Sequence, residues 1–276
     1  MKHIISRHPI VSYFVLAYAV SWGLASLILA PKLVSGEPIP QLSGLLMFPL
    51  MIIGPAIAGL SLRFLTDGVS GVKALLGGML RWRISARWYA ALLLPPLLVL
   101  GVLTALHYFV SPAFTIHWLP LGLVYGIAPG LLEEIGWSGY AFPVMTQRLG
   151  GFRAALVLGV LWGTWHLPVI DFLGGAYPHG AYWLLFAAAF IFAMTAMRVI
   201  IAWVYTNTRS LLLTQLLHAA STASLVIFSP FPITAAHETL WYWVYGGCLW
   251  VVALLVVVCC GAQLTAAKQS DRTLAA

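Results

Sequence analysis

Long apolar runs alternate with short polar segments along nearly the whole chain. A run of about 20 apolar residues is long enough to cross the hydrocarbon layer of a bilayer as a helix, which pairs its own backbone groups there. The pattern therefore predicts an all-α, polytopic membrane protein that forms one integral membrane domain over residues 1–276, with eight transmembrane helices. The expected spans are residues 11–30, 43–64, 88–110, 118–142, 154–172, 182–205, 211–228 and 240–261.

The composition agrees with a membrane location. Hydrophobic residues make up 62% of the chain and charged residues 8%, whereas roughly 25% charged residues are usual in a soluble domain. The net charge of +7 does not indicate a nucleic-acid partner, because the basic residues are spread over short loops and not gathered on one face. We expect membrane lipid around the protein, in a cytoplasmic membrane of the bacterial type.

The basic residues fall almost entirely in alternate loops. If the N-terminus lies inside, thirteen of the fourteen Lys and Arg residues flank the inner ends of the predicted spans, Arg198 among them, and only Lys32 lies outside. Cytoplasmic loops carry an excess of Lys and Arg. The distribution therefore predicts cytoplasmic N- and C-termini and an even number of spans.

Two adjacent carboxylates, Glu133 and Glu134, interrupt the fourth predicted span. Each ionised carboxylate near the centre of a bilayer costs roughly 2.5 to 3.5 kcal/mol on insertion scales, so a pair is expected to serve a function. Neighbouring helical residues point about 100° apart, so one carboxylate is expected to do chemistry and the other to support it. The alternative is a pair that lines a water-filled crevice or neutralises a buried cation.

Two histidines lie at a similar depth. A rise of about 1.5 Å per residue places Glu133, His166 and His218 roughly 14 to 20 Å from the inner face, so side chains from three helices are expected to meet there. Thr214 and Thr222 lie one turn on either side of His218 and belong to a polar stripe that should face the bundle interior.

Two neighbours are expected to shape the site. Trp162 lies one turn before His166 and would form a wall beside the imidazole. Gly130, one turn before Glu133, would leave room for a water molecule or a substrate backbone.

Three short motifs contain these residues. Residues 133–138 read E-E-I-G-W-S, residues 162–166 read W-G-T-W-H, and residues 218–222 read H-A-A-S-T. Their order and spacing resemble the CPBP or Abi family of intramembrane proteases, which includes CAAX prenyl endopeptidases and has the motifs E-E-x-x-x-R, F-x-x-x-H and H-x-x-x-N. The chain departs from each motif once, with Ser138 for Arg, Trp162 for Phe and Thr222 for Asn.

The resemblance implies an intramembrane endopeptidase that acts on a membrane-associated peptide or protein, such as one with a prenylated C-terminus. Glu133 would be the general base, His166 would hold the attacking water, and His218 with Thr222 would stabilise the oxyanion. Whether a metal takes part stays open. Glu133, His166 and His218 would also suit Zn²⁺ as ligands, although the chain has no H-E-x-x-H.

The missing Arg leads to a further expectation. An Arg at position 138 would lie one turn after Glu134 and pair with it, so Glu134 is expected to lack its usual counter-charge and, unless another cation reaches it, to be neutral. A catalytically impaired family member that acts as a peptide-binding or immunity scaffold is therefore an alternative.

Two other functions stay open. The tetrapeptide G-W-S-G at residues 136–139 matches the surroundings of the serine nucleophile of rhomboid proteases, with Ser138 as nucleophile, although so short a match arises easily by chance. The carboxylates and histidines could instead bind protons or a divalent ion in a transporter or channel. For a protease, the crevice is expected to open toward the cytoplasm.

Overall fold

The computed structural model describes residues 5 and 7–266, and these residues are helical with no strand among them. The all-α prediction is thereby confirmed. The helices are α2 (Pro9–Ser35), α3 (Gln41–Met51), α4 (Ile53–Gly77), α5 (Leu94–Phe109), α6 (Gly122–Gly136), α7 (Phe142–Leu149), α8 (Gly151–Trp165), α9 (Ile170–Leu173), α10 (Trp183–Thr208), α11 (Leu211–Ile227) and α12 (Ala235–Cys260). A 3₁₀ segment, Ala86–Leu93, leads into α5, and a π-helical turn, Trp137–Ala141, joins α6 to α7.

Helical segments occupy all eight predicted spans. Within the described part of the chain, five stretches are long and apolar enough to cross a membrane, and α8 and α11 are apolar but shorter. The five stretches are Pro9–Lys32, Gln41–Leu80, Ala86–Phe109, Gly180–Thr208 and Ala235–Cys260. The protein is therefore an integral multi-pass membrane protein, while the count of eight crossings and the side of the termini stay predictions.

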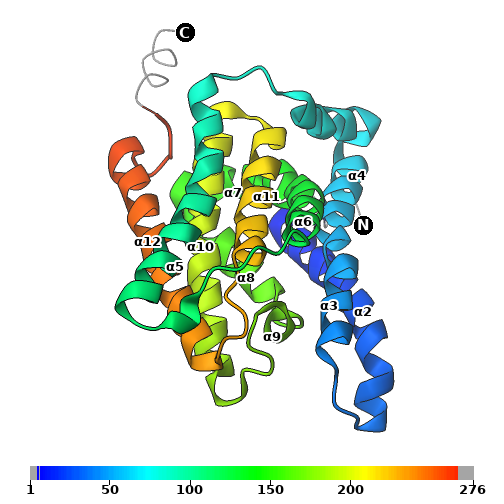
Figure 1. The fold of residues 1–276 in the computed structure, drawn as a ribbon. Helices are drawn as coiled ribbons and strands as arrows, with labels where there is room; N and C mark the ends of the chain where they lie inside the picture. The colour runs from blue at the N-terminus through cyan, green and yellow to red at the C-terminus, as the bar shows by residue number, and fades with distance from the viewer. Residues whose placement is uncertain (1–4, 6, 267–276) are drawn as a thin grey trace.

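The centre of the bundle is the contact between α6 and α11, with α10 packed against α8 and α12 (Figure 1). Glycines allow α6 and α11 to approach closely: a Cβ on Gly126 would lie 2.6 Å from the carbonyl oxygen of Ala219, and a Cβ on Gly130 would lie 2.6 Å from that of Gln215. Small residues at such contacts are typical of helix pairs in membranes. The expectation that Gly130 leaves room for water or substrate is wrong, because the α11 backbone fills that space.

Loops gather at both ends of the bundle. At one end, which we call the basic end, the Ser210 hydroxyl donates to the Arg81 carbonyl oxygen (2.6 Å), and the Phe152 N–H donates to the carbonyl oxygen of Ala262 (2.8 Å). The C-terminal end of α12 lies at this end (Figure 1). The segments joined there carry Arg81, Arg83, Arg148, Arg153 and Arg209.

The other end, which we call the opposite end, consists of residues 36–41, 110–121, 174–182 and 228–234. The Gln41 amide donates to the carbonyl oxygen of Gly174 (3.2 Å), and the Leu119 N–H donates to that of Ile227 (2.9 Å). The short helix α9 leads into this end (Figure 1). Of the described Lys and Arg residues, only Lys32 lies beside these segments.

Candidate functional site

Glu134 is fully buried and is paired with an arginine. The Arg198 guanidinium, on α10, donates to both carboxylate oxygens, from Nη1 to Oε2 (2.9 Å) and from Nη2 to Oε1 (2.8 Å). His218 Nδ1 lies 2.9 Å from Oε1, and the Ser138 hydroxyl donates to Oε2. Bidentate, charge-assisted pairing of this kind fixes the position of a carboxylate as well as neutralising it.

The expectation that Glu134 lacks a counter-charge and is neutral is therefore wrong. Arg198 was counted among the basic residues at the inner ends of the spans, but it lies within α10, which continues to Thr208, and it is 1% exposed inside the bundle. It supplies from another helix the cation that Ser138 does not supply. The small Ser138 side chain adds a hydrogen bond and occupies little of the space around the carboxylate.

Glu133 is also fully buried, but its two oxygens differ. Oε2 accepts hydrogen bonds from the indole nitrogens of Trp137 (3.1 Å) and Trp162 (2.9 Å). Oε1 has no hydrogen-bond partner among the described residues. A buried acceptor left unpaired costs about 1 to 3 kcal/mol, so this oxygen is placed to accept a proton or a hydrogen bond from a bound molecule.

The hydrogen bonds of the two histidines leave one ring nitrogen of each free. His166 follows the last residue of α8, and its Nδ1 lies 2.9 Å from the Trp162 carbonyl oxygen. His218 Nδ1 faces Glu134. Because a carbonyl and a carboxylate only accept, Nδ1 is the donor in both rings, and in the neutral form of each ring Nε2 is then an acceptor.

Trp162 contacts four charged or polar side chains, which are Glu133, His166, His218 and Arg198. Besides its bonds to Glu133 and His166, its ring centroid lies 5.0 Å from that of His218, and the Arg198 guanidinium carbon lies 4.2 Å from the ring centroid, in a cation–π contact. Trp162 was expected to form a wall beside His166. In the structure, Trp162 also positions Glu133.

A cavity of about 240 Å³ begins at these side chains. Trp162, His166, His218 and Thr222 line it together with mainly aromatic and aliphatic residues. Among the latter are Phe48, Tyr125, Phe172, Phe190, Trp241 and Tyr242. The arrangement provides an apolar chamber with two imidazoles and one hydroxyl at its inner part.

The other expected site residues lie outside the lining. Thr214 is fully buried and donates to the carbonyl oxygen of Leu211 (2.8 Å). It was expected to line the site, but it does not line the cavity. Ser138 is engaged with Glu134 and does not line it either. Glu133 and Glu134 are enclosed by protein and also lie outside the lining.

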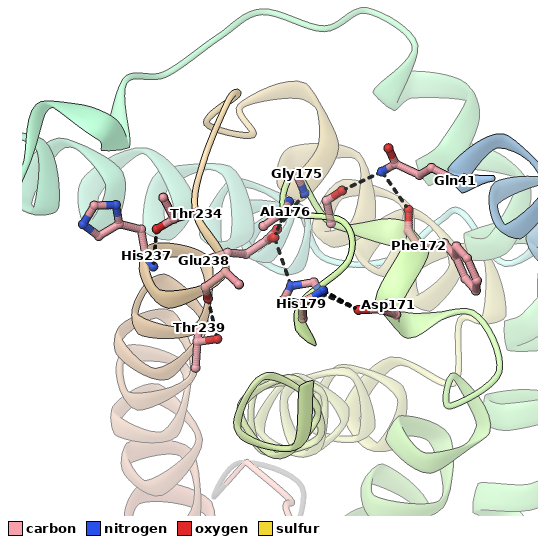
Figure 2. Close-up of polar contacts among 12 residues, drawn as sticks. Gln41, Asp171, Phe172, Gly175, Ala176, His179, Thr234, His237, Glu238 and Thr239 are labelled. Carbon is pink, nitrogen blue, oxygen red and sulfur yellow. Dashed lines mark hydrogen bonds and ion pairs between the residues drawn. The ribbon is translucent and has the colours of Figure 1, made fainter. Parts of the chain in front are cut away.

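A second polar cluster lies where the cavity approaches the opposite end (Figure 2). Glu238, in the first turn of α12, accepts from the N–H groups of Gly175 (2.9 Å) and Ala176 (2.7 Å). His179 lies between two carboxylates, with Nε2 3.2 Å from Glu238 and Nδ1 2.7 Å from Asp171. Burial lowers the pKa of His179, but its hydrogen bonds to the two carboxylates and their charges outweigh burial and raise it.

The cluster of Asp171, His179 and Glu238 was not predicted from the sequence. Its members lie in three separate segments, and neither their spacing nor their residue types form a known motif. The one available signal was that Glu238 is an acidic residue at the start of an apolar run.

The side chains do not assemble the zinc ligand set that the sequence left open. In the described part of the chain, no group of three or more His, Cys, Asp or Glu side chains is arranged to hold a metal ion. Two indole N–H groups occupy one oxygen of Glu133. We therefore derive no step through a metal.

Comparison with known proteins agrees with the motifs. The model of the family described as type II CAAX prenyl endopeptidase Rce1-like matches residues 115–224, which include Glu133, Glu134, His166 and His218. A CAAX prenyl protease 2 from Methanococcus maripaludis is 27% identical over 139 residues, which cover 46% of this chain and 51% of that protein. The chain thus spans about half the length of the curated relative that it matches. The family resemblance predicted from the motifs is thereby confirmed, and it is to the Rce1-like CAAX prenyl endopeptidases.

Proposed function

We propose that the protein is an intramembrane endopeptidase of the CAAX-protease type, which hydrolyses a peptide bond with water activated by Glu133 and His166. The observation that carries the proposal is the unpaired, fully buried Oε1 of Glu133, whose other oxygen, Oε2, accepts from two indoles. One of these indoles, that of Trp162, lines an apolar cavity together with two imidazoles. A base in such a setting is oriented before the substrate arrives, which is the condition for efficient proton transfer.

In the proposed reaction, His166 Nε2 and Glu133 Oε1 bind the attacking water. The water oxygen bonds to the peptide carbonyl carbon while one water proton passes to Glu133. The electron pair of the C=O bond moves onto the carbonyl oxygen, which becomes the oxyanion. When the tetrahedral intermediate collapses, the C–N bond breaks and Glu133 returns the proton to the leaving nitrogen. Glu133 therefore acts first as base and then as acid.

The developing oxyanion would be held by His218 and Thr222. The Thr222 hydroxyl lines the cavity one turn after His218 and can donate to the oxyanion. The contact of His218 Nδ1 with Glu134 leaves the Nε2 edge of this ring for the substrate. The Arg198–Glu134 pair fixes this imidazole without touching the substrate. Donors placed for the oxyanion in advance account for roughly 10²- to 10³-fold in rate each.

The lining of the cavity and the matched relative support the substrate class that we propose. The matched relative is named a prenyl protease, and the aromatic and aliphatic walls of the cavity suit an apolar, membrane-associated polypeptide, including one with a prenylated C-terminus. Membrane lipid and such a polypeptide are the partners that we propose.

The test is cleavage of a prenylated peptide reporter and its unprenylated counterpart by purified protein. We expect Glu133→Gln, His166→Ala and His218→Ala each to lower the rate roughly 10²- to 10⁴-fold while the helical circular dichroism is unchanged. His107→Ala, a histidine near the end of α5 that does not line the cavity, is the matched control and should cleave as wild type does. Cleavage at the wild-type rate by the three site variants would disprove the proposal.

The alternatives from the sequence have less support. The recorded hydrogen bond of the Ser138 hydroxyl goes to Glu134 and not to a histidine, so the arrangement of a serine protease is not formed. The scaffold alternative rested on an uncompensated Glu134 and on Thr222 in place of Asn, and Arg198 removes the first of these two reasons. Capture of the reporter without cleavage would favour the scaffold, and proton or metal flux in liposomes would favour the transporter.

A further inference from the structure

The cavity extends from the site toward the opposite end, and α11 shows its direction. This helix starts at the basic end, where Ser210 contacts Arg81, and finishes at the opposite end, where Ile227 contacts Leu119. From His218 onward, its lining residues run only toward the latter end; they are Thr222, Leu225, Val226 and, just beyond the helix, Ser229.

The other helices around the cavity agree. Helix α8 starts beside the C-terminal segment of the basic end and finishes at His166, and the chain beyond it lines the cavity from Phe172 to Gly175. Helix α6 runs in the reverse direction, and its contribution comes from its first turn, at Leu121 and Tyr125. Within residues 7–266, no segment of the basic end contributes to the lining.

The mouth of the cavity is built from loops of the opposite end. Leu121 and Phe231 line it and are 61% and 57% exposed. Gln41 and Glu238, also part of the lining, each bind the segment that follows α9, so that α3, this segment and α12 are tied together around the mouth (Figure 2). Among the described residues no Lys or Arg lines the cavity.

The distribution of Lys and Arg residues indicates that the basic end and the opposite end lie on different sides of the membrane. With Arg198 buried on Glu134 and Lys32 near the opposite end, the other twelve of the fourteen Lys and Arg residues flank the inner ends of the predicted spans. Such loops remain in the cytoplasm. The opposite end, and with it the mouth of the cavity, then faces away from the cytoplasm.

We infer that the protein takes its substrate from the non-cytoplasmic side of the membrane. On the proposed function, on which this inference rests, the substrate is a membrane-anchored polypeptide whose scissile bond lies close to that surface. The expectation of a crevice open to the cytoplasm, drawn from the same basic loops, is thereby replaced, since the cavity and the basic loops lie at different ends.

Thiol labelling in cells tests the orientation without any need for catalysis. In a background in which Cys248, Cys259 and Cys260 are replaced by Ser, Ser229→Cys places a thiol in the cavity lining and Ser70→Cys places one on the exposed part of α4 near the basic end. We expect a membrane-impermeant maleimide to label Ser229→Cys in intact spheroplasts and Ser70→Cys only after lysis. The reverse pattern would overturn the inference.

A reporter cleaved in cells tests the substrate side. The reporter is one transmembrane helix followed by a short apolar segment and an epitope tag, made in two orientations that present the segment outside or inside. We expect wild type, but not Glu133→Gln, to cleave the outside form. Cleavage of the inside form alone refutes this inference and keeps the protease, whereas outside labelling with no cleavage of either form supports the orientation and contradicts the protease.

Discussion

The charge on Glu134 is compensated by a residue that is distant in the sequence. Arg198 lies 64 positions later and makes two hydrogen bonds to the carboxylate, while the neighbour one turn away on α6 is the small Ser138. The imidazole of His218 shares the same carboxylate. Glu134 therefore serves to hold His218 and Arg198 in place, and its environment has room for one guanidinium.

Ser138→Arg is expected to destabilise the protein. It would bring a second guanidinium to a carboxylate whose oxygens already accept from Arg198 and His218. One buried cation would be left without an anion, which costs about 3 to 5 kcal/mol. The thermal unfolding midpoint in detergent should fall clearly, whereas Ser138→Ala, which loses one hydrogen bond, should cost only about 1 kcal/mol.

The double variant Ser138→Arg with Arg198→Met makes the test specific. It restores one cation for one carboxylate, so it should be more stable than Ser138→Arg and should recover part of the cleavage. A double variant no more stable than the single one would show that the two positions do not exchange roles.

The sequence predicted those features of the site that depend on a local pattern. The depth of Glu133, His166 and His218 follows from helical rise, and the structure brings these residues to one place through Trp162. Arg198 could not be identified, because a basic residue near the end of an apolar run has the same sequence pattern whether it lies in a loop or pairs inside the bundle. The Glu238–His179 contact depends on loop conformation, which hydrophobic periodicity does not determine.

At the scale of elements, the contact of α6 with α11 places the carboxylates beside His218. The two helices approach through glycines on α6, and the space above Gly130 is filled by the α11 backbone and Ala219. The contact therefore depends on the absence of a side chain at these positions.

Gly130→Ala is expected to force the two helices apart. The added Cβ would lie 2.6 Å from the Gln215 carbonyl oxygen and 2.8 Å from the Ala219 Cβ, and overpacking of this kind costs about 1 to 3 kcal/mol. Both the unfolding midpoint and the cleavage rate should fall. Gly101→Ala is the matched control on α5, where an added Cβ meets nothing within 4 Å, and it should be neutral or slightly stabilising.

The segment after α9 is expected to lose stability as pH rises. The pKa of His179 in the folded protein is raised by hydrogen bonds and charges of Asp171 and Glu238, despite burial against Phe186. The stability from this pairing is therefore fully present below the unfolded pKa of about 6.5 and is lost as pH passes through the raised folded value.

His179→Gln measures this contribution because glutamine does not titrate. The difference in Tm between wild type and His179→Gln should be largest below about pH 6.5 and should shrink at higher pH. His107→Gln, outside the cluster, should show no such trend. A difference between wild type and His179→Gln that is constant with pH would contradict a charged His179.

At the scale of the whole molecule, run length predicted helices in all eight places, because the length of an apolar stretch is a local property. The ends and interruptions were less predictable. The second expected span is two helices, α3 and α4, and α4 is kinked at Gly68, whose φ of 67° lies in the left-handed region. The direction of the cavity was not predictable either, since it depends on which faces of several segments meet.

The distance along the chain between Glu134 and Arg198 also bears on how the protein is made. Helix α6 emerges from the ribosome with two carboxylates well before α10 has been synthesised, and each ionised carboxylate costs roughly 2.5 to 3.5 kcal/mol in the bilayer. We therefore expect α6 to enter the membrane only temporarily, or to wait at its surface, until α10 delivers the guanidinium. Stable integration of α6 would then be a late step of biogenesis, and nascent chains that end before Arg198 should leave α6 accessible to added protease, whereas chains that extend beyond α10 should protect it.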